Sequence, residues 1–168
     1  MRIRAEEPGD EAAVRVVNAS AFETALEANL VDALREQAGP LVSLVAEDNG
    51  AVVGHIMFSP VVLSGHPALR IMGLAPMAVL PAHQRKGVGS ALVRAGLDQC
   101  RQLGFGAVVV LGRPAFYPRF GFSPSTRFGI GCEYDVPKDA FLVLELQAGA
   151  LGRASGTIRY HAAFGAAG

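Results

Sequence analysis

The sequence has little of what usually holds small secreted or metal-bound domains together. It contains 2 cysteines in 168 residues, Cys100 and Cys132, which are widely separated and form no Cys-x-x-Cys pair. This pattern argues against a disulfide framework and against a cysteine zinc site. The 4 histidines show no metal-ligand spacing either: they are His55, His66, His83 and His161. We therefore expect no metal.

Net charge and long apolar runs are also missing. Lys and Arg together number 15, as do Asp and Glu, so the formal net charge is zero. The molecule as a whole should attract neither nucleic acid nor an anionic membrane, although a local basic patch is still compatible with this balance. No run reaches the roughly 18 apolar residues of a membrane span. Residues 1–7 are charged and lack the apolar region of a signal peptide, so the cytoplasm is the expected location.

What is present is an ordinary globular composition. Hydrophobic residues make up 51% of the chain and charged residues 18%, which is typical of a globular protein. The length favours one domain, and we find no linker and no internal repeat. Residues 1–168 are therefore expected to form a single domain of mixed α/β type.

Helices and strands can be placed along the chain from periodicity and turn residues. Asp10 can cap a helix that extends through Val17, and leucines at fourfold spacing predict a second helix over residues 22–37. A hairpin turn is expected at Asp48-Asn49-Gly50. Strands are predicted around Ile3 and over residues 41–47, 51–63, 69–80, 107–111, 141–146 and 157–160.

A strand, a glycine turn and a helix start lie at the centre of the sequence. The strand over residues 69–80 ends at Pro81, and Gly87-Val88-Gly89-Ser90 then opens a helix that Gly104 should end. Arg94, Asp98 and Arg101 would be exposed on this helix. Its buried stripe is predicted from three- and four-residue spacing and comprises Val88, Ala91, Leu92, Ala95 and Leu103.

This helix start suits an anion. The first amides of a helix have no partner inside it, and the helix dipole is positive at that end. Gly87 and Gly89 remove side chains that would block close approach by a diphosphate. Two familiar phosphate loops are excluded, because Leu92 stands where Gly-x-Gly-x-x-Gly needs glycine and no Gly-x-x-x-x-Gly-Lys-Ser/Thr is present. What remains is Gln84-x-x-Gly87-x-Gly89.

A second motif follows at a distance that makes the first one specific. It is the segment Pro114-Ala-Phe-Tyr-Pro-Arg-Phe-Gly-Phe122, separated from the glycine turn by the predicted strand over residues 107–111. With both motifs in this order, the chain resembles the GNAT superfamily of N-acetyltransferases. The resemblance implies a GNAT-like acyl-CoA N-acyltransferase fold: a mostly antiparallel central sheet, a strand-helix-strand crossover, and fourth and fifth strands that splay apart. Pro76, which has no amide for a ladder, lies where the fourth strand would bulge; the alternative is a proline at a wet sheet edge.

The resemblance also implies how acetyl-CoA would bind as the acyl-donor cosubstrate. Backbone groups of Met77, Ala78 and Val79 would pair with the pantetheine arm, and the Met77 amide would hold the thioester carbonyl as its oxygen gains charge. The amides of the following turn would hold the diphosphate. The residues of that turn are Gln84, Arg85, Lys86, Gly87, Val88, Gly89 and Ser90. The side chains of Arg85 and Lys86 either add charge near the phosphates or belong to a solvated turn.

Tyr117 is the candidate acid. Its phenol, with an ordinary pKa of about 10, can protonate the departing CoA thiolate; the alternative is a tyrosine that simply packs in the core. The base is missing from the expected place, because Gly73 stands where many relatives carry glutamate on the fourth strand. A water chain, Glu23, Glu27 or His55 could substitute.

These observations predict transfer of an acetyl group from acetyl-CoA to a primary amine by direct attack. The absent glutamate motivates an alternative, a CoA-binding sensor or scaffold that has lost efficient chemistry. A third reading is a diphosphate module for another nucleotide, which would not need the segment around Tyr117. No residue selects the acceptor, and a homodimer is common among proteins of this kind.

Overall fold

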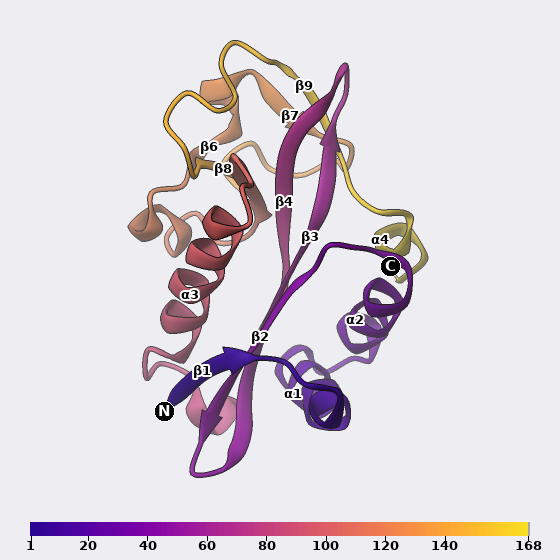
Figure 1. Cartoon of the computed structure of the whole chain (residues 1–168), viewed down its shortest axis with the longest axis vertical. Coiled ribbons are helices and arrows are strands. Elements are labelled where there is room, and N and C mark those ends of the chain that lie inside the picture. Colours follow the sequence, from indigo (N-terminus) through magenta and orange to yellow (C-terminus); the bar gives the residue numbers. More distant parts are fainter. Residues whose placement is uncertain (168) are drawn as a thin grey trace.

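The computed structural model describes residues 1–167 and contains a twisted mixed sheet with helices on both faces (Figure 1). The strands are β1 (Arg2–Ala5), β2 (Val42–Asp48), β3 (Ala51–Leu63), β4 (His66–Val79), β5 (Ala107–Leu111), β6 (Ser123–Pro124), β7 (Ile130–Cys132), β8 (Phe141–Glu145) and β9 (Gly156–Arg159). The helices are α1 (Glu11–Phe22), α2 (Leu26–Gln37), α3 (Val88–Gln102) and α4 (Ala162–Ala167). Short 3-10 turns lie at η1 (Pro8–Asp10), η2 (Pro81–His83), η3 (Tyr117–Phe120) and η4 (Ser125–Phe128).

The sheet has the predicted pattern of antiparallel strands followed by one parallel crossover. Its main order is β1-β2-β3-β4-β5-β8-β6, and the only parallel neighbours in this path are β4 and β5, which α3 connects. The predicted hairpin joins β2 to β3: Asn49 and Gly50 both have positive φ, 52° and 80°, as the favoured two-residue turn requires.

β3 pairs with two different strands along its outer side. Its first part pairs with β2 up to Val42↔Phe58, and its last part pairs with β9 through Val62↔Arg159 and Leu63↔Ile158. β9 also runs parallel to β7. The C-terminal part of the chain therefore adds β9, and β7 beside it, to the sheet next to the end of β3.

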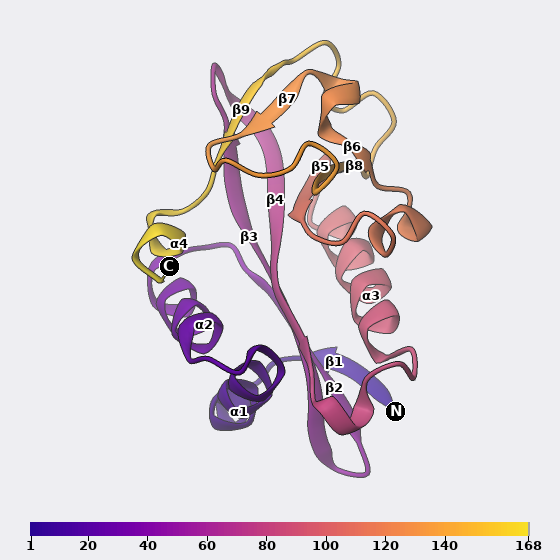
Figure 2. The ribbon, with the colours of Figure 1, turned by 180° about the vertical axis from the view of Figure 1, so that it is seen from behind.

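The two faces of the sheet carry different helices. α3 covers one face, and α1, α2 and α4 cover the other (Figures 1 and 2). The core under α3 includes Phe58 of β3, whose ring packs so closely on Gly96 that a β-carbon there would overlap it. In the part of the chain that the structure describes, no helix has both the length and the apolar character needed to cross a membrane.

The N-terminal helices differ in detail from the prediction. The second helix begins at Leu26 rather than near residue 22, because Glu23 adopts a left-handed conformation (φ 61°) that ends α1. Asp10 stands at the N-terminus of α1, but its carboxylate caps the preceding turn instead. It accepts from the amide of Glu7 at 2.7 Å and from the guanidinium of Arg4 at 2.7 Å.

The prediction that Leu103 belongs to the buried stripe of α3 is wrong. Leu103 is 40% exposed, because it follows the last helical turn, where the chain reverses at Gly104 (φ 85°). Phe105 takes over the apolar position: its amide donates to the Cys100 carbonyl at 3.1 Å and its side chain is buried. The predicted cap at Gly104 is confirmed, as is the exposure of the charged side chains on α3, namely Arg94, Asp98 and Arg101.

In the C-terminal third, the strands predicted over residues 141–146 and 157–160 are confirmed as β8 and β9, and several shorter elements lie outside the predictions. β6, η4 and β7 lie within residues 123–137, where no periodic pattern was long enough to assign, and the apolar tail forms α4. These pieces are two to six residues long, and such elements are defined by long-range packing rather than by local periodicity.

Candidate functional site

The candidate site is the gap that opens between β4 and β5. The two strands pair at Ile71↔Ala107, Met72↔Val108 and Gly73↔Val109, and no further. β4 continues to Val79 and β5 to Leu111, so both strands extend beyond their last shared pair. The predicted splaying of the fourth and fifth strands is confirmed, and Gly73 lies at its vertex.

A bulge at Pro76 bends β4 at the start of this gap. The register with β3 passes from Phe58↔Leu74 to Ile56↔Met77, so Ala75 and Pro76 together oppose Met57 alone. Pro76 is buried, which rules out the alternative of a wet sheet edge. A bulge tolerates a residue without an amide hydrogen and turns the strand.

After the bulge, the backbone of β4 presents polar groups to the gap. The Leu80 amide donates to the Val53 carbonyl at 2.9 Å. Because an antiparallel ladder alternates residues that face the partner with residues that face away, Ala78 faces β3, whereas Met77 and Val79 face away from it. The side-chain amide of Gln84 donates to the Val79 carbonyl at 3.0 Å, which fits this orientation. The Met77 amide thus points to the side that β5 has vacated.

The glycine turn lies at the open end of the gap. Gly87 precedes the first turn of α3 with φ 85°, and its carbonyl accepts from the Ala91 amide at 3.0 Å. A β-carbon at Gly89 would lie 3.5 Å from Cε of Met77 and 3.9 Å from Cζ of Phe116. The helix start, β4 and the aromatic segment therefore meet at one place.

The mouth of α3 is not covered by protein. Gln84, Arg85, Lys86 and Gly87 are all exposed, and Gly89 and Ser90 are partly exposed. Of the predicted diphosphate residues, only Val88 is buried, because its side chain packs into the core under α3. The exposed amides remain accessible to an anion.

Tyr117 begins η3 and packs next to the end of β5. Its ring packs directly on Gly112, where a β-carbon would overlap it, and makes edge contacts with Phe116 and Phe122 at centroid distances of 5.0 and 5.6 Å. Burial raises the pKa of Tyr117 to about 12, partly opposed by the positive charge of Arg113. The phenol therefore keeps its proton at neutral pH, as a proton donor must. The side chain is part of the core under α3, as the alternative from the sequence expected.

The positions considered for the base are less favourable. A β-carbon at Gly73 would lie 2.9 Å from Cγ1 of Val61 and 3.1 Å from Cε1 of Tyr160. Tyr160 therefore occupies the space beside Gly73 into which a side chain would extend. No local motif in the sequence marks Tyr160, and only its packing on Gly73 of β4 reveals it.

His55 is a structural residue rather than a free base. It is completely buried, its Nδ1 accepts from the Asn18 carboxamide at 3.1 Å, and its Nε2 donates to the Ser43 hydroxyl at 2.9 Å. Burial, with the nearby positive charge of Arg35, lowers its pKa to about 3. With both nitrogens engaged, His55 has no free lone pair for a substrate proton.

The two helical glutamates remain at the surface. Glu23 is exposed where α1 ends, and Glu27 accepts from the Thr24 hydroxyl at 3.2 Å in the first turn of α2. Within residues 1–167 no three His, Cys, Asp or Glu side chains gather in a way that could hold a metal ion.

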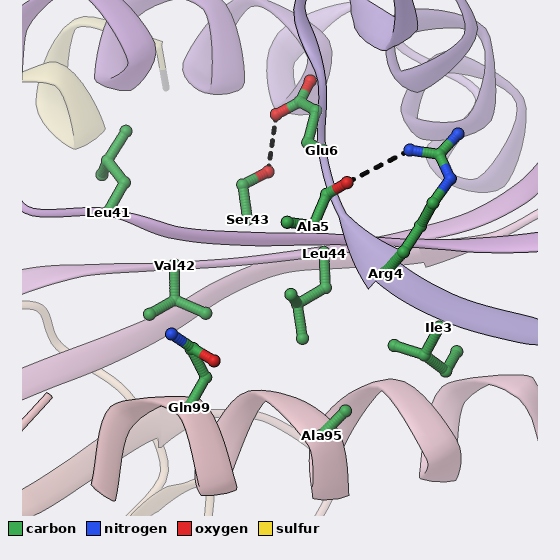
Figure 3. A pocket seen from close by; sticks show the side chains of 10 residues that line it. All are labelled: Ile3, Arg4, Ala5, Glu6, Leu41, Val42, Ser43, Leu44, Ala95 and Gln99. Carbon is green, nitrogen blue, oxygen red and sulfur yellow. Dashed lines mark hydrogen bonds between the residues drawn. The ribbon is translucent and has the colours of Figure 1, made fainter. Parts of the chain in front are cut away.

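The surface also has a hollow that is separate from the gap between β4 and β5. It lies between β1, the start of β2 and α3, where Val42 and Leu44 face Ala95 and Gln99 (Figure 3). No residue of the glycine turn, β4 or the Tyr117 segment lines it. The gap, and not this hollow, brings together the predicted residues.

Comparison with known proteins points to one family. The sequence model of the acetyltransferase (GNAT) family matches residues 11–122. YhbS of Escherichia coli K12, an uncharacterized N-acetyltransferase, is 38% identical over 165 residues, 98% of each chain. Its crystal structure in complex with CoA matches with a TM-score of 0.92 at 37% identity, covering 98% of this chain and 91% of that one. A GNAT acetyltransferase of Brucella melitensis in complex with acetyl-CoA matches with a TM-score of 0.80 at 38% identity, over 97% of each chain.

Proposed function

Since the chain belongs to the acetyltransferase (GNAT) family, we propose that it transfers an acetyl group from acetyl-CoA to a primary amine by direct attack. The observation that carries the proposal is the parting of β4 and β5 beside an open helix start. A slot edged by unpaired backbone suits a pantetheine arm, and free amides at a helix start suit a diphosphate. The CoA and acetyl-CoA complexes of the two relatives support this assignment.

We assign the donor site to backbone groups along this path. Met77, Ala78 and Val79 hold the pantetheine arm, with the Met77 amide donating to the thioester carbonyl. That hydrogen bond strengthens as the oxygen gains negative charge during attack. The diphosphate lies at the turn, on residues Gln84, Arg85, Lys86, Gly87, Val88, Gly89 and Ser90. The Gln84 side chain adds a supporting role, because its bond to the Val79 carbonyl fixes the end of β4 to the turn.

Tyr117 serves as the general acid. Attack by the amine forms the C–N bond and breaks the C–S bond, and the phenol protonates the departing sulfur. Its raised pKa keeps the proton available at neutral pH. Its ring packs on Gly112, next to the end of β5, and not on Gly73 at the vertex of the gap.

The test is a thiol-release assay with acetyl-CoA and a panel of primary amines. Acceptor-dependent release of CoA thiol, with one acetyl amide formed per thiol, is the expected result. Tight acetyl-CoA binding without release on any amine would favour the alternative, a CoA-binding sensor or scaffold. The observation that motivates this alternative is the packed environment of Gly73, which leaves no side chain at the usual position of the base.

We also propose a domain organisation, a location and an oligomeric state for this enzyme. Residues 1–168 act as one catalytic domain in the cytoplasm, and a homodimer is compatible with this assignment. Size-exclusion chromatography with light scattering measures the oligomeric state directly.

A further inference from the structure

An aromatic group covers the vertex of the gap on the face opposite α3. The ring of Tyr160 packs on Gly73 and lies between Tyr134 and Phe164, with centroid distances of 5.8 and 5.0 Å. Tyr160 follows β9, and Phe164 belongs to α4. Tyr134 is 37% exposed, so one ring of the group faces solvent.

A carboxylate is fixed next to these rings. The Glu133 amide donates to the Ile158 carbonyl at 3.2 Å, which extends the β7–β9 ladder by one residue. Its Oε1 accepts from the Tyr160 amide at 2.8 Å. Among residues 1–167 no other hydrogen bond to this carboxylate is present, and Glu133 is exposed. Oε2 is therefore available to a ligand while Oε1 holds the side chain in place.

The loop that begins with Glu133 connects the vertex of the gap to the end of β5. It starts beside Tyr160 at the vertex and ends at Ala140, whose carbonyl accepts from the Gly112 amide at 2.9 Å. Gly112 is the residue on which the Tyr117 ring packs. In Figure 2 this loop passes in front of β4 between β7 and β8. One connection thus joins the vertex to the end of β5 that carries the proposed acid.

We propose that Glu133, Tyr134 and Tyr160 form the seat of the acceptor's amino group, and that Glu133 removes its proton. The substrate class is then an alkylamine that arrives as an alkylammonium ion. Aromatic faces and a carboxylate are the groups that recognise such a cation. The inference rests on the proposed acetyl transfer, and it supplies the base that Gly73 cannot provide.

The proton balance of the reaction follows from these positions. The ammonium gives one proton to Glu133, which releases it to solvent, and the neutral nitrogen attacks the thioester carbon. As the C–N bond forms and the C–S bond breaks, nitrogen loses a second proton to solvent, and Tyr117 regains a proton from solvent after protonating sulfur. This loss balances the proton that Tyr117 gives to sulfur. The products are an N-alkylacetamide, CoA thiol and one proton in solution.

Two acceptors of different basicity test the role of Glu133. Glu133→Gln keeps the shape and the bond to the Tyr160 amide but cannot take a proton. We expect kcat/KM for an alkylamine at neutral pH to fall about 100-fold or more, with KM for acetyl-CoA unchanged. An aromatic amine such as aniline, which is already neutral at this pH, should lose no more than a few-fold. Asp135→Asn, on the same loop, is the matched control and should retain wild-type activity. Equal alkylamine activity in Glu133→Gln and wild type would overturn the proposal.

A binding measurement separates this proposal from the proposed function. Choline, a quaternary ammonium that cannot be acetylated on nitrogen, should bind wild-type protein in calorimetry in the presence of CoA. Binding should weaken in Glu133→Gln and in Tyr134→Ala, an exposed position where the substitution leaves the core intact. If wild type acetylates no amine, the proposed function fails, and choline binding alone then judges the seat. Choline affinity that is absent from wild type, or unchanged in both variants, refutes it.

Discussion

Acid should destabilise the fold through His55, which is buried as a neutral ring. The ring lies between Asn18 and Ser43. The Ser43 hydroxyl in turn donates to the Glu6 carboxylate at 2.6 Å, and Glu6 is paired with Arg35. Protonation would place a hydrogen and a positive charge on Nδ1 against the Asn18 carboxamide hydrogens. The folded protein therefore resists protonation until the pH approaches the lowered pKa of about 3.

The sign and size of this change in unfolding free energy with pH follow from proton linkage. Between the ordinary pKa of 6.5 and the folded pKa of about 3, the unfolded chain binds a proton that the folded chain does not, so stability rises with pH across this interval. The contribution is complete above pH 6.5 and is lost as the pH falls. Each pH unit is worth about 1.4 kcal/mol, so unfolding free energy should drop by roughly 2 kcal/mol between pH 7 and pH 5. Asp10, whose pKa is lowered from 3.8 to about 2, changes the unfolding free energy only below the window from pH 7 to pH 5.

Urea unfolding at pH 7 and pH 5 measures the effect. A His55→Gln variant, which cannot take up the proton, should be less stable at pH 7 because buried hydrogen bonds are lost, by about 1–3 kcal/mol. Its free energy of unfolding should differ little between the two pH values. The same free energy for the wild type at pH 7 and pH 5, or an equal decrease in both proteins, would refute the reasoning.

Three further substitutions test the site and the packing behind it. Tyr117→Phe should lower kcat for thiol release about 100-fold while the acetyl-CoA affinity stays near wild type; an unchanged kcat would remove the residue from the mechanism. Gly87→Glu should weaken acetyl-CoA binding roughly tenfold or more in calorimetry, because it adds bulk and negative charge at the helix start. Gly87→Ala, which carries the same cost of positive φ, is its control, and equal affinities of the two variants would contradict this reason. Gly96→Ala should lower unfolding free energy by about 1–3 kcal/mol, since overlap with the Phe58 ring outweighs the gain in helix propensity; an unchanged or higher melting temperature would show that the ring moves aside.

The sequence was most informative where local chemistry decides the structure. The hairpin at Asn49-Gly50 and the cap at Gly104 depend on positive φ, which few residues other than glycine and asparagine adopt readily, and both predictions are confirmed. The bulge at Pro76 follows from a missing amide hydrogen, again a local property. The order of strands around α3 was predicted correctly because a parallel pair requires a crossover.

The sequence was least informative where contacts join distant segments. Tyr160 packs on Gly73 because β9 returns to β3, and no spacing in either segment announces that contact. His55 could be proposed as a base from its residue type, yet its partners Asn18 and Ser43 come from a helix and another strand. Leu103 fits the helical stripe, but α3 ends at Gln102, so the Leu103 side chain stays exposed instead of packing on the sheet. In each case the outcome depends on burial, which periodicity alone does not fix.

β3 pairs with β2 along its first part and with β9 along its last part, so two distant parts of the chain meet on one strand. The segment that we propose binds the donor ends before Phe122, where the match to the family's sequence model also ends. The residues that we propose receive the acceptor, Glu133, Tyr134 and Tyr160, belong to the C-terminal part of the chain, which pairs with β3 through β9. If both proposals hold, exchanging this C-terminal part between relatives would change the amine that is acetylated and leave coenzyme binding unchanged.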